Sequence, residues 1–201
     1  MPIISINHQL KKIFLLLFFS IIATLKYAII DQLSKWWFKN MLLTKQGYSI
    51  PVTSFLDLVY SWNHGISFGL FQQYESLSNK IFLGLNTIVV LYVWKLLLNS
   101  PNYKFYIGYS LIIGGALGNL YDRFFNGAVF DFIYFHYKEF YFPAFNFADS
   151  FIFIGAFTVV LEYYKHAKSV AKKKDQEYDD VAAEAEKIRK LDEKIAEKGI
   201  K

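Results

Sequence analysis

Apolar residues gather into four long runs along the chain, at residues 13–30, 81–98, 105–121 and 147–164. Each run approaches the roughly 20 apolar residues that a helix needs to span the hydrocarbon core of a bilayer. We therefore predict four transmembrane helices. The first run is followed by the polar stretch DQLSK and by no small-residue cleavage site, so we interpret it as a retained anchor and not as a secretory signal.

Two segments depart from this pattern. Residues 48–71, YSIPVTSFLDLVYSWNHGISFGLF, mix β-branched and aromatic residues with a proline and glycines, which predicts short strands. Residues 167–201 alternate ten basic with nine acidic side chains, which is typical of a solvated helix or a disordered extension. The predicted fold is an all-α membrane protein with four transmembrane helices and a small extracytoplasmic β-rich platform between the first two. Residues 1–166 form its membrane-embedded domain and residues 167–201 a cytoplasmic tail.

Composition and charge support a membrane setting. Of the 201 residues, 54% are hydrophobic and 20% aromatic, more than an ordinary soluble domain carries. Cysteine is absent, which excludes disulfides, thiolate metal ligands and a cysteine nucleophile. Basic residues gather on one side of the predicted helices, so the positive-inside rule predicts that both termini are cytoplasmic. These residues are Lys11, Lys12, Lys104, Lys165, Lys168, Lys172, Lys173 and Lys174.

Polar residues near the other ends of the predicted helices are the candidates for chemistry. Asp131 stands in the apolar context VFDFI, where an ionised carboxylate is unfavourable without a partner. Asn146 and Asp149 open the fourth helix, and a helix cap would explain them locally. Asp31 and Lys35 are four residues apart and can pair on one helix face, although an interfacial ion pair with a snorkelling lysine explains them equally well.

Small residues in the third predicted helix indicate close helix packing. Gly114 and Gly118 are four residues apart on one helix face, where they allow the backbone of another helix to approach.

A return of the chain between Asp131 and Asp149 would bring the two carboxyl groups together. Two such acids share a proton, so that one acts as base on a water and the other as acid toward a carbonyl. This is aspartic-protease chemistry. A carrier or channel with a proton relay would need acids distributed through the membrane depth, whereas these cluster at one side. A scaffold subunit would leave Asp131 without a role, so we favour proteolysis.

Five motifs in the same order carry a family resemblance. They are DQLSK at 31–35, NHGISFG at 63–69, GGALGNLYDR at 114–123, GAVFDFI at 127–133 and FNFADS at 145–150. Together they resemble signal peptidase II, the lipoprotein signal peptidase of bacteria (aspartyl peptidase family A8), over residues 13–165. The resemblance implies an intramembrane aspartyl endopeptidase of the inner membrane, which removes the signal peptide from diacylglyceryl-modified prolipoproteins just before the lipidated cysteine. Separately from the resemblance, we expect a monomer.

The resemblance also implies roles for individual residues. Asp131 and Asp149 match the catalytic positions, and no metal or cofactor is implied. The expected partners are diacylglyceryl-prolipoprotein substrates and membrane lipid, with no nucleic acid. His64 departs from the small or polar residue expected in its motif, and its role stays open, as does that of the tail. The motif positions expected to bind substrate or support the site are Asp31, Lys35, Asn63, Asn119, Asp122, Arg123 and Asn146.

Overall fold

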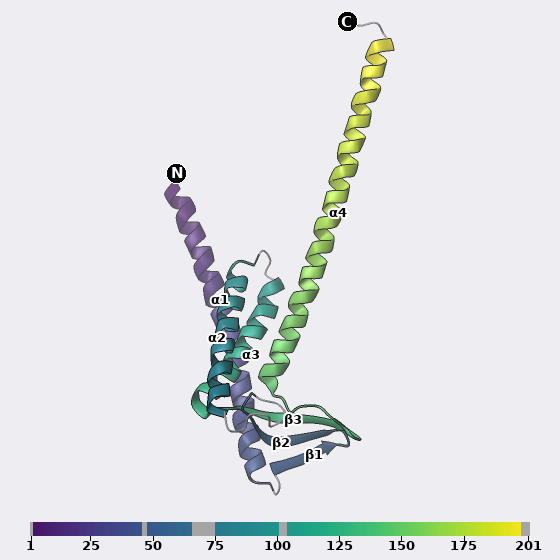
Figure 1. Ribbon diagram of the computed structural model, residues 1–201. Coiled ribbons are helices and arrows are strands. Elements are labelled where there is room, and N and C mark those ends of the chain that lie inside the picture. Colours follow the sequence, from purple (N-terminus) through teal and green to yellow (C-terminus); the bar gives the residue numbers. More distant parts are fainter. Residues whose placement is uncertain (1, 46–47, 66–74, 101–103, 198–201) are drawn as a thin grey trace. The chain divides into compact units, whose positions relative to one another are not determined.

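The computed structural model describes residues 2–45, 48–65, 75–100 and 104–197 (Figure 1). The second half of the NHGISFG motif and the end of the predicted platform segment lie outside these residues. The described chain is mostly helical and contains one small antiparallel sheet. Its helices are α1 (Pro2–Leu43), α2 (Glu75–Leu98), α3 (Lys104–Asn126) and α4 (Phe147–Glu197).

Three helices in the described part of the chain are long and apolar enough to cross a membrane. They contain the stretches Leu17–Leu43, Leu77–Leu98 and Phe147–Lys190. The third helix of the chain, α3, carries the polar residues Asn119, Asp122 and Arg123 in its last two turns and is rich in glycine. A fourth span therefore stays a prediction. The first helix continues well beyond the apolar run 13–30, so that Asp31 and Lys35 lie within it.

The sheet is built from two separate parts of the chain. Strands β1 (Ser49–Thr53) and β2 (Leu56–Asn63) lie between α1 and α2, whereas β3 (Val129–Tyr137) and β4 (Phe140–Tyr141) lie between α3 and α4. The four strands are antiparallel and neighbour one another in chain order. The sequence pattern predicts strands only in the first of these segments. The pairing of β2 with β3 places Asp131 opposite Ser61.

The sheet lies at the end of the helices where α1 finishes and α4 begins (Figure 1). Aromatic side chains fill this junction, because alternate residues of β3 point toward α1. Phe130 and Phe132 are buried with Leu42 of α1, and the ring of Phe38 stacks on that of Phe132 at a centroid distance of 4.3 Å. This aromatic layer holds β3 against the helices.

Close packing of α1 against α3 depends on two glycines of α3. A Cβ atom at Gly114 would lie 2.6 Å from the Cβ of Tyr27 and 2.7 Å from the carbonyl oxygen of Thr24. A Cβ atom at Gly118 would overlap the carboxylate of Asp31. The predicted close approach of a neighbouring helix at these glycines is confirmed, and it lets the polar end of α1 reach α3.

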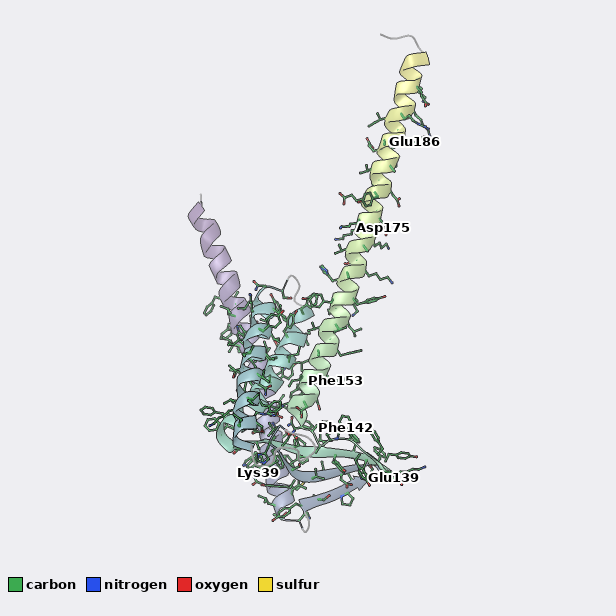
Figure 2. All side chains as sticks on the ribbon, viewed as in Figure 1. Lys39, Glu139, Phe142, Phe153, Asp175 and Glu186 are labelled. Atoms are coloured by element: carbon green, nitrogen blue, oxygen red, sulfur yellow. The ribbon has the colours of Figure 1, made fainter. Side chains whose placement is uncertain are left out.

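The chain divides into two compact units, residues 1–159 and 160–201. In the second unit, the described residues continue α4 as an exposed helix to Glu197, from which Asp175 and Glu186 project (Figure 2). Ion pairs three or four residues apart link Lys165 to Glu162 and Arg189 to Glu186. This stretch of alternating charge is helical in the structure.

Candidate active site

Polar side chains from four elements meet where the sheet joins the helices. Asp31 and Lys35 come from α1, Asn119, Asp122 and Arg123 from the end of α3, and Asp131 from β3. Asp149 lies in the first turn of α4, and Asn146 directly precedes that helix. Asn63, at the end of β2, contacts the same group through Asp131. The structure thus brings together every site residue named from the sequence.

Asp131 is the buried acid of the group, with 1% of its surface exposed. Asn63 Nδ2 donates a hydrogen bond to its Oδ2 at 3.0 Å, and Asn146 Nδ2 donates to its Oδ1 at 2.6 Å. Burial raises the pKa of Asp131 to about 7, and the negative charge of Asp149 adds to this, against the opposing effects of the two amide donors and Lys35. Asp131 therefore changes protonation state near neutral pH.

Asp149 lies in the first turn of α4 and is half-buried. Its backbone N–H donates to Asn146 Oδ1 at 3.0 Å, and the N–H of Asn146 donates to Asp149 Oδ2 at 3.2 Å. This reciprocal pair is a helix cap, and the predicted cap is confirmed. Asp149 does more than cap the helix, because its Oδ1 also accepts a hydrogen bond from Asn119 Nδ2 at 2.8 Å.

Asn146 connects the two acids. It is fully buried, its side-chain amide donates to Asp131, and its cap holds Asp149. The chain reaches this position because it returns along β3, where Phe145 and Ile133 exchange backbone hydrogen bonds of 2.9 Å. The chain thus returns on itself between Asp131 and Asp149, which is the condition for the two carboxyl groups to come together.

Lys35 lies at the centre of a second network, next to the acids. Its Nζ lies 2.8 Å from Asp31 Oδ2, 2.8 Å from Asp122 Oδ2 and 2.9 Å from Asn119 Oδ1. The predicted pairing with Asp31 is confirmed. The snorkelling interpretation is wrong, because only 4% of the Lys35 side chain is exposed.

The acids around Lys35 tie it to neighbouring elements. Asp31 Oδ1 accepts a bond from the N–H of Ala148 in α4 at 2.8 Å, and Asp122 Oδ2 accepts one from the N–H of Phe130 in β3 at 3.3 Å. Lys35 therefore stabilises the junction of α1, α3, β3 and α4.

Arg123 is buried beside these networks. Its guanidinium carbon lies 5.5 Å from the centroid of the Phe82 ring, and its positive charge interacts with the negative charges of Asp149 and Asp131. Among the described residues, its Nε has no hydrogen-bond partner. Arg123 thus supplies positive charge close to the acids.

Gln32 is a further residue of the site that the sequence pattern alone does not single out. Its Nε2 donates to the carbonyl oxygen of Gly118 at 3.0 Å and to Asp122 Oδ1 at 3.2 Å. The only indication of this role in the sequence is that Gln32 lies inside the DQLSK motif. His64, whose role was left open, accepts a hydrogen bond from Ser78 Oγ at its backbone carbonyl.

No group of three or more His, Cys, Asp or Glu side chains in the described part of the chain has an arrangement that could hold a metal ion. The oxygen atoms of Asp31, Asp122, Asp131 and Asp149 instead accept hydrogen bonds or ion pairs from amide, backbone and lysine donors. The arrangement offers two neighbouring carboxyl groups with different exposure, which is suited to acid–base catalysis.

Comparisons with known proteins identify the class of this protein. The family described as Signal peptidase (SPase) II matches residues 12–165, and the chain belongs to the signal peptidase II family. It is a multi-pass membrane peptidase. A solved bacterial membrane enzyme, determined by the in meso method at 2.3 Å resolution, shares 28% identity and a TM-score of 0.61, and the match covers 75% of this chain and 90% of that one.

Individual relatives are more similar still. The lipoprotein signal peptidase of Rickettsia conorii is 50% identical over 185 residues, which cover 91% of this chain and 92% of the relative. That of Rickettsia felis is 50% identical over 182 residues, covering 90% and 92%. The R. conorii match covers 91% of this chain, which is a larger share than residues 1–165 make up. The match therefore includes part of the charged tail.

Proposed function

We propose that this protein is an aspartyl endopeptidase that removes the signal peptide from diacylglyceryl-modified prolipoproteins, cutting just before the lipidated cysteine. Asp131 and Asp149 are its catalytic residues in this proposal. The observation that carries it is the pair of acids joined through Asn146, one buried with its pKa raised to about 7 and the other half-buried.

The different surroundings of the two acids suggest their roles. Asp131 holds the shared proton, and Asp149 is the base. Asp149 takes a proton from a water molecule, and the oxygen of that water attacks the scissile carbonyl carbon. At the same time Asp131 gives its proton to the carbonyl oxygen. When the resulting tetrahedral intermediate collapses, the C–N bond breaks, the leaving nitrogen takes the proton from Asp149, and a hydroxyl of the intermediate returns one to Asp131. Both acids are then restored.

The remaining residues position these two acids. Asn63 and Asn146 orient Asp131 by donating to its two oxygens, and Asn119 orients Asp149. Lys35 holds Asn119 through its Oδ1. Arg123 stabilises negative charge that develops in the site, as a fixed cation does in a low-dielectric surrounding.

The proposal includes an orientation in the membrane. We place the enzyme in the bacterial inner membrane as a monomer with four spans, both termini in the cytoplasm and the acids near the outer face. Positive charge in the segments on the opposite side supports this orientation. The clustering of the acids at one end of the helices supports proteolysis over a proton relay, which would need them along the membrane depth.

The decisive test is cleavage of a defined substrate. The purified protein is incubated with a diacylglyceryl-modified prolipoprotein, and the position of the cut is read by mass spectrometry. We expect Asp131→Asn and Asp149→Asn each to lower the rate by about 10³-fold, because neutral amides cannot exchange the proton. Asp175→Asn, on the exposed tail, is the matched control and should cleave normally. Near-normal turnover by either site variant, folded by circular dichroism, would refute its catalytic assignment.

Dependence on the substrate lipid is a separate test. An anchored diacylglyceryl group confines the scissile bond to the depth of the acids, and such confinement lowers the barrier through effective concentration. One prolipoprotein peptide is therefore compared with and without its diacylglyceryl group in the same detergent. We expect the lipid-free peptide to be cleaved far more slowly. Equal rates would exclude lipid dependence while leaving the aspartyl mechanism in place.

A further inference from the structure

A cavity of about 720 Å³ lies between α1 and α3, apart from the two proposed catalytic acids. We call it the α1–α3 groove. Trp62 of β2 and Phe130 of β3 line it together with the two helices, whereas neither Asp131 nor Asp149 does. Its volume falls in the range of roughly 300–1,000 Å³ that is usual for ligand pockets.

The walls of the groove are apolar and follow the helix axis. Leu25, Ile29 and Leu33 line it from α1, and Leu117 and Tyr121 line it from α3. The three α1 side chains are also exposed to the surroundings, which in a membrane-spanning helix are lipid. The groove is therefore open to acyl chains of the bilayer.

The length of the groove matches one leaflet of a membrane. Leu25 and Lys39 are its first and last lining residues on α1, and fourteen helical residues rise by about 21 Å. One leaflet comprises about 15 Å of hydrocarbon and about 6 Å of headgroup region. A lipid with its headgroup at the Lys39 end therefore fits along the groove.

Lys39 gives this end of the groove a positive charge. It lies on α1 beside the sheet (Figure 2), and its Nζ is 4.7 Å from the centroid of the Trp62 ring. No ion pair of Lys39 occurs among the described residues. The other charged lining residues, Lys35 and Asp122, are paired with each other at 2.8 Å. A lysine that has no ion pair in the described part of the chain, at the polar end of an apolar groove, is suited to a phosphate.

We propose that the α1–α3 groove binds a glycerophospholipid with an anionic headgroup from the surrounding bilayer, with its phosphate at Lys39 and an acyl chain along Leu25, Ile29 and Leu117. The charge of Lys39 selects this occupant over the diacylglyceryl group of a substrate, which carries no negative charge. The proposal goes beyond the proposed function and depends only on the membrane setting of the chain.

The test measures lipid retention by the full-length protein in detergent, using native mass spectrometry. Dioleoylphosphatidylglycerol is the anionic probe and dioleoylphosphatidylcholine the zwitterionic one. We expect the protein to retain the anionic lipid preferentially and Lys39→Gln to weaken that retention about fivefold. Lys45→Gln, which removes an exposed lysine outside the groove, should retain it normally.

A second pair of variants tests the apolar wall. Ile29→Trp fills the groove and should weaken retention of the anionic lipid, whereas Ile30→Trp, on the neighbouring exposed position outside the groove, should not. Equal retention of both lipids by the unaltered protein, or normal retention by Lys39→Gln, would overturn the proposal. Displacement of phosphatidylglycerol by a diacylglyceryl-modified peptide would also overturn it, because the groove would then belong to the substrate. Cleavage measured on the same preparations bears on the proposed function alone.

Discussion

The candidate active site and the tail helix beyond residue 160 use the same types of charged residue in opposite ways. In the site, Lys35 and its partners are buried, and most of the contacts that join them link residues distant in sequence. Asn119 is 84 residues from Lys35, and Asp31 reaches Ala148 across 117 residues. In the tail, exposed side chains pair at three or four residues, such as Lys187 with Glu184. Buried charges depend on the fold for their partners, whereas exposed charges need only a helix.

Replacing one lysine in each region tests this difference and should give the largest effect. Lys35→Met leaves the carboxylates of Asp31 and Asp122 buried without their cation, which should lower the free energy of unfolding by about 3–5 kcal/mol. Lys187→Met removes a 77% exposed partner and should change it by less than about 0.5 kcal/mol. Thermal unfolding in detergent measures both. Similar melting temperatures for the two variants would show that the buried network does not stabilise the fold.

The pH dependence of stability sharpens the same comparison. Folded Asp131 has a pKa of about 7, above its ordinary 3.8, so the folded protein keeps a proton that the unfolded chain releases between these values. The free energy of unfolding should therefore fall as the pH rises through this window, by at most about 1.4 kcal/mol per pH unit. Asp131→Asn should lose this slope, whereas Asp175→Asn in the tail should keep it. Melting temperatures measured across this pH window test the prediction. If stability depended on pH in Asp131→Asn as it does in the unaltered protein, the raised pKa of Asp131 would be contradicted.

A smaller effect is expected from a single added methyl group. Gly118→Ala places a Cβ against the carboxylate of Asp31 and should destabilise the protein by about 1–3 kcal/mol, because the packed helices must separate. Gly84→Ala is the matched control, since no atom lies within 4 Å of the added group. It should be neutral or stabilise α2 by up to about 1 kcal/mol. Equal melting temperatures for Gly118→Ala and Gly84→Ala would mean that α1 and α3 move apart at no cost to make room for the added methyl group.

Local features of the structure could be predicted from the sequence. The cap of Asn146 and Asp149 and the pair of Asp31 and Lys35 follow from spacings of three and four residues on a helix. Gly114 and Gly118 marked a close helix contact, and the structure identifies α1 as the neighbour. Each of these predictions needed only the local geometry of one helix.

Features that depend on distant contacts could not be predicted. The strand that carries Asp131 pairs with β2, whose Asn63 is 68 residues away, and no local spacing reports that register. The run VFDFIYFHY has the aromatic and β-branched composition of a strand, so its type was predictable while its partner was not.

The continuation of α1 to Leu43 was also predictable, because no proline or glycine interrupts residues 31–43.

Removing the tail should have the smallest effect on catalysis. A protein that ends after Lys174 keeps the basic cluster Lys172–Lys174, which supports orientation in the membrane, and loses the residues from Asp175 onward. We expect an unchanged cleavage rate, because the family match ends at residue 165 and the tail's described ion pairs are exposed and local. Part of the tail is nevertheless shared with the R. conorii relative, so the cleavage rate is measured in detergent, separately from the amount of protein that inserts into membranes. Normal insertion with lost cleavage would show that the tail serves the active site. Normal cleavage with poor insertion would instead assign the tail to assembly in the membrane and preserve the contrast between the two regions.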